Sequence, residues 1–192
     1  MVRAYDPARS VDRATLRRLL ALATRAPSAG FSQGWDFVVL DRPEQLATFW
    51  RATTDDSRPA DTWLTGMRSA PALVVCWSDP QRYLDRYAEP DKGWHDRSLV
   101  HWPIPYWDVD TGMAAHTLLL AAVDEGLAGC FFGVPAEGIE QVRQALGVPP
   151  DRRLVGVVAL GHPAPDRRSP SLRRGRRPLE DVVHHGRFGV TS

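Results

Sequence analysis

The chain has 192 residues, of which 43% are hydrophobic and 24% are charged, and its formal net charge is +1. This composition supports a complete hydrophobic core, and the length favours a single domain over residues 1–192. A net charge near zero argues against a disordered chain and against a general nucleic-acid-binding protein.

The first part of the chain predicts a helix, a strand and a second helix. Apolar residues recur at helical spacing over 11–25, and this amphipathic helix ends at Pro27. The run 36–41 predicts a short buried strand, and another helix is expected after Pro43. Pro, Ser, Ala and Gly crowd the joint in RAPSAGFSQGW, so an exposed turn separates two apolar segments.

The middle of the chain predicts a buried strand, a long loop and a central helix. Residues 70–77 are almost continuously apolar, as expected of a strand covered by helices on both faces. Residues 87–107 mix charges, prolines and tryptophans without a helix or strand period, and a loop of this length is usually functional. From about 108 to 125 the pattern is helical and apolar nearly all round, which predicts a central helix.

After a predicted strand at 129–133, a short helix at 136–146 and a strand at 154–160, the chain ends in a basic tail. Its arginines are Arg167, Arg168, Arg173, Arg174, Arg176, Arg177 and Arg187. In Arg174-Gly175-Arg176, an extended backbone would place both guanidiniums on one side, an arrangement that suits a phosphate monoester. A solvated basic tail is the alternative.

Several kinds of site have no signature in this sequence. The six histidines lack the spacing of a metal site, and no nucleophile turn, Walker loop or G-x-G-x-x-G fingerprint is present. Cys76 and Cys130 lie in apolar runs, which predicts buried, reduced thiols. No leader or membrane-spanning run is evident, so a cytoplasmic protein with neither membrane nor nucleic-acid partners is expected.

The stretch RAPSAGFSQGWDFVVL resembles the R-x-P-S-x-x-N-x-Q-P-W-x-F-x-V motif of the FMN-dependent nitroreductase superfamily. The blocks DVDTGMAAHTLLLAAVDEGLAG, LVGVVALGHPAPD and RRGRRPLEDVV follow in the order of that family. The resemblance implies an α+β fold, a three-layer α/β/α sandwich with a mostly antiparallel central sheet and a long central helix. It also implies an intertwined homodimer with FMN at the interface.

By the same resemblance, the turn of one subunit contacts the flavin held by the other. The implied cofactor-binding residues are Arg3, Pro27, Ser28, Ala29, Gly30, Phe31, Gly133, Val134, Arg174 and Arg176, and the expected substrate-binding residues are Trp102, Tyr106 and Trp107. Arg174 and Arg176 match the pair on the FMN phosphate, and Gly133 begins the turn that places an amide near flavin N5. The chain departs from the family pattern at Phe31, Gly34 and His116, where Asn, Pro and Asn or Gln are usual.

The implied function is an FMN-dependent oxidoreductase with NADH or NADPH as electron donor. It would reduce nitroaromatic, quinone or similar planar acceptors by ping-pong hydride transfer, and no catalytic side chain and no metal are predicted, because the cofactor carries the chemistry. Two alternatives keep the fold: a flavin-binding carrier, and an enzyme that dehalogenates aromatic substrates or consumes the flavin itself, with little NAD(P)H-driven reductase activity.

Overall fold

The computed structural model describes residues 1–54, 59–167 and 169–190, so the tail residue Arg168 lies outside the described residues. Its helices are α1 (Arg13–Ala23), α2 (Pro43–Thr53), α3 (Thr62–Arg68), α4 (Pro80–Tyr87), α5 (Tyr106–Asp124) and α6 (Ile139–Leu146). Its strands are β1 (Trp35–Leu40), β2 (Ala72–Ser78), β3 (Ala128–Phe132) and β4 (Arg153–Gly161). Short 3₁₀ turns occur at Ala29–Phe31, Leu99–His101, Ala136–Gly138, Pro170–Arg174 and Leu179–Asp181. The predicted α+β class is confirmed.

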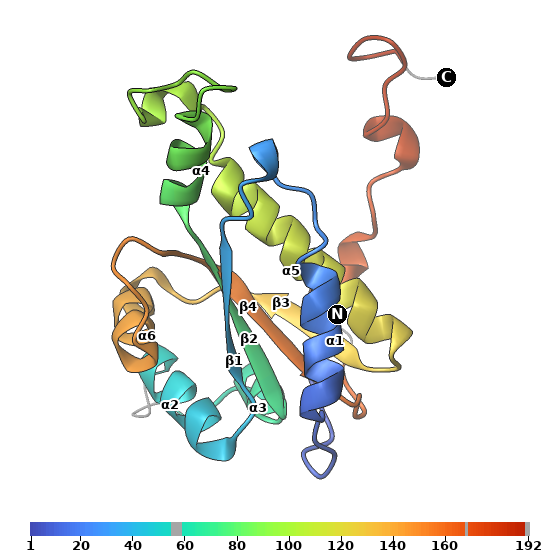
Figure 1. The fold of residues 1–192 in the computed structure, drawn as a ribbon. Helices are drawn as coiled ribbons and strands as arrows, with labels where there is room; N and C mark the ends of the chain where they lie inside the picture. Colours follow the sequence, from blue (N-terminus) through green and yellow to red (C-terminus); the bar gives the residue numbers. More distant parts are fainter. Residues whose placement is uncertain (55–58, 168, 191–192) are drawn as a thin grey trace.

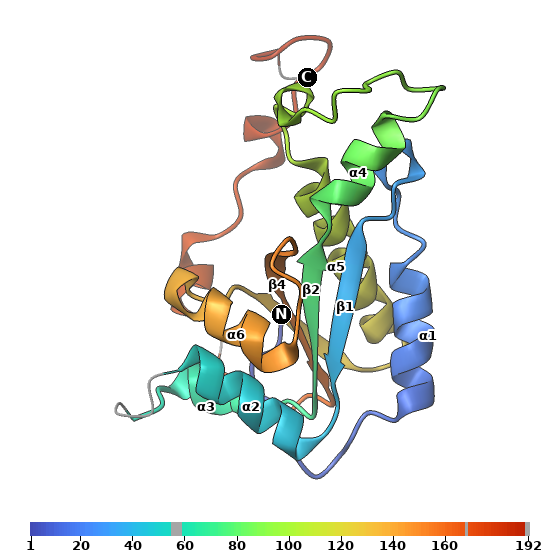
Figure 2. The ribbon, with the colours of Figure 1, turned by 60° about the vertical axis from the view of Figure 1, so that its left-hand side comes forward.

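The four strands form one sheet in the order β1-β2-β4-β3, and every pair is antiparallel. Helices α1 and α5 cover one face of the sheet, and α2, α3 and α6 cover the other (Figures 1 and 2). The chain therefore forms the predicted three-layer sandwich. Strands β1 and β3 are its two edges.

The position of strand β2 in the sheet explains why its sequence is almost continuously apolar and does not alternate between apolar and polar residues. All seven of its residues are buried. Leu73, Val75 and Trp77 belong to the core shared with α2 and α6. The intervening residues, Ala72, Val74 and Cys76, belong to the core shared with α1 and α5. Because side chains alternate between the faces of a strand, a strand between two helical layers needs apolar residues on both faces, and the first six residues of β2 are apolar.

The central helix begins two residues earlier than predicted. Pro105 stands at its N-cap, and the amides of Asp108 and Val109 donate to the Pro105 carbonyl. The helix packs on α1 through residues such as Leu118, which is fully buried. Among the residues that the structure describes, no helix is long and apolar enough to cross a membrane.

Two helices were not predicted from the sequence. In α4, Pro80 occupies the first turn and the Asp79 carboxylate accepts hydrogen bonds from the amides of Gln81 and Arg82. Tyr83, Leu84 and Tyr87 recur at helical spacing in this helix, but its eight residues are too few for the apolar period to identify it. Helix α3 is only seven residues long. The segment expected to be a loop from 87 to 107 is therefore confined to 88–105.

The contact between α1 and α5 provides a test of the fold. Replacing the fully buried Leu19 with Ala should lower the free energy of unfolding by about 2–5 kcal/mol, because a cavity is left between the helices. The same change at Leu22, which is 49% exposed, should cost less than about 0.5 kcal/mol. Urea denaturation measures both variants, and equal losses would contradict this packing.

Candidate functional site

The N-terminal segment and residues 166–167 and 169–176 of the tail line a basic cavity of about 390 Å³. Its lining is Met1, Arg3, Asp166, Arg167, Ser169, Leu172 and Arg176, and we call it the Arg3 cavity. The N-terminal segment is held beside β3, where the Val2 amide donates to the Gly129 carbonyl over 3.2 Å. The Arg3 amide donates to Asp166 Oδ2 over 2.8 Å. Guanidiniums from opposite ends of the chain thus converge on one small space, which suits a phosphate group.

Helix α3 closes one side of this region because residue 66 is glycine. A Cβ at Gly66 would overlap the Arg3 carbonyl oxygen. A second cavity of about 390 Å³ lies there and is lined by Thr62 and Thr65 of α3 as well as by Arg3. Both cavities also share Asp166 and Arg167 and therefore adjoin. The hydroxyls of α3 add neutral donors to the charged ones.

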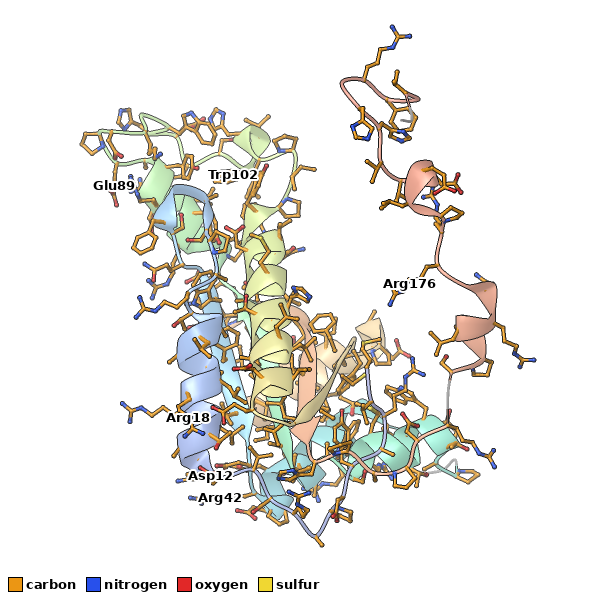
Figure 3. The ribbon with its side chains drawn as sticks, turned by 90° about the vertical axis from the view of Figure 1, so that its right-hand side faces the viewer. Asp12, Arg18, Arg42, Glu89, Trp102 and Arg176 are labelled. Atoms are coloured by element: carbon orange, nitrogen blue, oxygen red, sulfur yellow. The ribbon has the colours of Figure 1, made fainter. Side chains whose placement is uncertain are left out.

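The tail does not have the extended shape expected around Arg174. Ser169 and Pro170 start a 3₁₀ turn that includes Arg174, and Gly175 ends it with a φ of 70°. The two arginines consequently do not lie on one side of a straight segment. Arg176 lines the Arg3 cavity whereas Arg174 does not, and Figure 3 shows the Arg176 side chain extending from the tail toward the body of the molecule.

An apolar cavity of about 360 Å³ follows the end of β3. Its walls include Trp50, Trp63, Leu64, Phe132, Gly133 and Val134, and we call it the Trp63 cavity. The rings of Trp50 and Phe132 are stacked at 5.9 Å with an interplanar angle of 8°, and Trp63 meets Phe132 edge-on at 5.7 Å. No atom lies within 4 Å of a Cβ built on Gly133, so the backbone there faces open space. Such walls suit a flat aromatic ligand.

The predicted contact turn has an unusual backbone. Gly30, Phe31 and Gln33 have φ values of 60°, 58° and 51°. A left-handed conformation is rare for a residue as bulky as Phe, and strain of this kind concentrates at functional sites. The Phe31 side chain is nevertheless 76% exposed. The turn therefore holds an aromatic ring out toward solvent.

The structure does not bring this turn together with the two cavities in one chain. The turn leads into β1, whereas Gly133 follows β3 and Arg3 lies in the segment beside β3. Since β1 and β3 are opposite edges of the sheet, the predicted cofactor residues form two groups. In Figures 1 and 2 the turn lies beside α4 at the far edge.

Two of the predicted substrate-binding residues are buried. Trp102 and Trp107 pack around Tyr83, with ring centroids 5.8 and 6.1 Å from the tyrosine ring. Figure 3 shows Trp102, which belongs to the segment 88–105, close to the N-terminal end of α5. Tyr106 is 43% exposed, so of the three it alone presents a large part of its ring to solvent.

A row of exposed side chains follows the outer face of α5. Its members, spaced alternately by three and four residues, are Tyr106, Val109, Met113, His116, Leu120 and Val123. This is the spacing of a helix seam that packs against another helix. Within the described residues nothing covers this row.

Neither cysteine is a nucleophile in this environment. Burial raises the pKa of the Cys76 thiol to about 12. Burial also raises the pKa of Cys130. Both sulfurs are unpaired and buried, as predicted, and a thiol with a raised pKa is unreactive at neutral pH. Covalent catalysis through sulfur is therefore not supported.

Trp50, Trp63 and Asp166 line the two cavities but were not among the site residues predicted from the sequence. Trp63 lies on the unpredicted α3, and a single tryptophan carries no motif. Asp166 has a side chain in the Arg3 cavity because of the path of the tail, which the sequence does not reveal. The arginines that follow Asp166 in the sequence are the one feature that could have drawn attention to this position.

Comparison with known proteins identifies relatives along most of the chain. The nitroreductase family model matches residues 1–162. An Archaeoglobus fulgidus protein named "Putative NADH dehydrogenase/NAD(P)H nitroreductase" is 27% identical over 164 residues, which cover 84% of this chain and 79% of the relative. A protein of Rhodospirillum rubrum named 5,6-dimethylbenzimidazole synthase is 30% identical over 177 residues, covering 85% of this chain and 78% of the relative.

Among solved structures, the FMN-dependent nitroreductase of Clostridium difficile R20291 superposes with a TM-score of 0.68. The superposition covers 97% of this chain and 94% of that protein, at 21% sequence identity. This likeness shows that the two chains share a fold.

If the Arg3 cavity holds the phosphate of FMN, the different placements of Arg176 and Arg174 predict different effects on FMN binding. Arg176→Ala should raise the dissociation constant for FMN by about 10- to 100-fold, because a charge-assisted bond to phosphate is worth about 1.5–3 kcal/mol. Arg174→Ala, outside the Arg3 cavity, should raise it less than about threefold. Titration followed by flavin fluorescence compares the two, and a larger effect at Arg174 would contradict the assignment.

Proposed function

This chain belongs to the nitroreductase family of oxidoreductases, and on that premise we propose that it is an FMN-dependent NAD(P)H oxidoreductase acting on nitroaromatic, quinone or similar planar acceptors. The observation that carries the proposal is the convergence of Arg3 and Arg176, from opposite ends of the chain, on one cavity. The Trp63 cavity supplies apolar walls at the same edge of the sheet, the β3 edge.

The residues that line the two cavities match the two parts of FMN, its phosphate and its flat ring system. The Arg3 cavity has permanent positive charge for a phosphate, and the hydroxyls of Thr62 and Thr65 lie close by. The Trp63 cavity is aromatic and borders the open backbone at Gly133. We propose that Arg3 and Arg176 hold the phosphate, and that Gly133 and Val134 lie against the ring system.

We propose further that a second copy of the chain completes the site. The turn at residues 27–31 is at the opposite edge of the sheet, so it can reach these cavities only from another subunit. The uncovered row on α5 offers an apolar surface for such a dimer. Residues Pro27, Ser28, Ala29, Gly30 and Phe31 would then contact the cofactor held by the partner.

When bound, FMN would supply the chemistry for hydride transfer between NADH or NADPH and the acceptor. The chain itself would hold the phosphate with the guanidiniums of Arg3 and Arg176, and the open backbone at Gly133 would orient the ring system. Tyr106 presents an exposed ring where a planar acceptor could stack, Trp102 packs edge-on against it, and Trp107 packs in turn against Trp102. Donor and acceptor would use the same space in turn, which gives ping-pong kinetics.

One alternative is an enzyme of the same fold that dehalogenates aromatic substrates or consumes its flavin. The long segment 88–105, whose residues Trp94 and Trp102 pack with Tyr83 and Trp107, is compatible with such an activity. A carrier that binds flavin without NAD(P)H-driven reduction is the other alternative. These possibilities differ in the fate of the flavin.

The purified protein, reconstituted with FMN, should be yellow and should bleach when NADH or NADPH is added anaerobically. Addition of a quinone should then restore the flavin absorbance at about 450 nm without loss of flavin over many turnovers. Absorbance spectra and chromatography of the released flavin are the measurements. Progressive conversion of FMN to another compound would favour the flavin-consuming enzyme, and a bound flavin that resists both donors would favour the carrier.

A further inference from the structure

The turn at residues 27–34 is fixed by hydrogen bonds to two helices and to one neighbouring backbone amide. The Ala29 amide donates to Asp110 Oδ2 over 2.8 Å, and Arg86 Nε donates to the Gly30 carbonyl over 2.9 Å. At the end of the turn, the Gly34 carbonyl accepts from the Asp79 amide over 2.9 Å. The strained backbone is thus held from α5, from α4 and from the end of β2.

Asp110 is the least expected of these groups. It lies on α5 and is 1% exposed. Among the described residues no basic side chain forms an ion pair with it, and its hydrogen-bond donors are the Ala29 amide and the Tyr83 hydroxyl, each at 2.8 Å. An unpaired carboxylate is costly to bury, so its presence needs a compensating role.

Tyr83 is built to remain a donor to this carboxylate. Burial, followed by the hydrogen bond to Asp110, raises the pKa of the Tyr83 hydroxyl well above its usual value. The phenol therefore keeps its proton at any ordinary pH. Its ring also contacts the turn, since a Cβ at Gly34 would overlap it, and this explains why Gly34 stands where the family motif has proline.

The conformation that these bonds hold is an unfavourable one. Left-handed φ angles at Phe31 and Gln33 would relax if the turn were released. A hydrogen bond to a charged acceptor is roughly twice as strong as a neutral one. A carboxylate at position 110 therefore holds the turn more firmly than an amide of the same shape.

We infer that Asp110 is a positioning residue, which fixes the 27–31 turn in the shape that contacts the cofactor across the dimer. It acts through the Ala29 amide and does not itself touch the cofactor. This inference rests on the proposed function, because it assumes that the turn contacts FMN. Its structural half, the control of the turn, does not depend on a ligand.

Three variants separate charge, hydrogen bonding and general damage. Asp110→Asn keeps the shape and one acceptor oxygen but loses the charge, whereas Asp110→Ala loses both. Ser78→Ala is the matched control, because it removes another partly buried hydrogen bond at this end of the sheet, from Ser78 to Asp108 (2.6 Å), without removing a bond to the turn. Thermal unfolding establishes that each variant is folded.

Two measurements are made on each variant. In the flavin-free protein, amide hydrogen exchange at Ala29 should be faster in Asp110→Ala by at least tenfold and unchanged in Ser78→Ala. The dissociation constant for FMN should rise about 3- to 10-fold in Asp110→Asn, about 10- to 100-fold in Asp110→Ala, and less than twofold in Ser78→Ala.

Unchanged Ala29 exchange in Asp110→Ala, or in Asp110→Asn if the alanine variant does not fold, would overturn the inference. So would equal FMN affinity in wild type and a folded Asp110 variant. A wild-type protein that binds no FMN would instead overturn the proposed function, and the exchange measurement would still test whether Asp110 holds the turn.

Discussion

The separation of β1 and β3 to opposite edges of the sheet is the constraint on which the rest of the molecule depends. With strands about 4.8 Å apart, the edges of four strands lie about 14 Å from each other. Packed helices fill both faces between them, so a ligand cannot cross the sheet within one chain. In the proposed site, each edge therefore contributes one group of residues, and the two groups come from different chains.

Each half of the proposed site is made by a different physical device. At the β3 edge, a glycine lets α3 approach the N-terminal segment, and charges from the two ends of the chain gather there. At the β1 edge, a buried carboxylate holds a strained turn that displays Phe31. One half supplies charge and apolar walls, and the other supplies a rigid contact. In the proposed dimer, two copies of the chain pair through the exposed row on α5, and this pairing brings the two halves of the site together.

Much of this architecture could be predicted from the sequence. Apolar periodicity located α1, β2 and α5, and the continuous apolar run of β2 correctly indicated two covering layers. Helices α3 and α4 were not predicted, because α3 has only seven residues and α4 has only eight, of which Tyr83 alone is buried. The route of the tail could not be predicted, since Gly175 and Ser169 redirect it locally, and the extended shape expected around Arg174 was therefore wrong. Asp110 was missed because it is separated from Ala29 by 81 residues and belongs to no motif.

The most direct measurement is FMN content in a mixed dimer. One chain carries Arg3→Ala and Arg176→Ala, and a differently tagged chain carries Gly30→Val, which cannot keep its φ of 60° or avoid the Tyr87 ring. Each variant alone should bind FMN poorly, but the purified mixed dimer should bind one FMN and show about half of the wild-type turnover, because one composite site is intact. A mixed dimer without FMN would contradict a site shared between subunits, since it would mean that each chain needs both groups for itself.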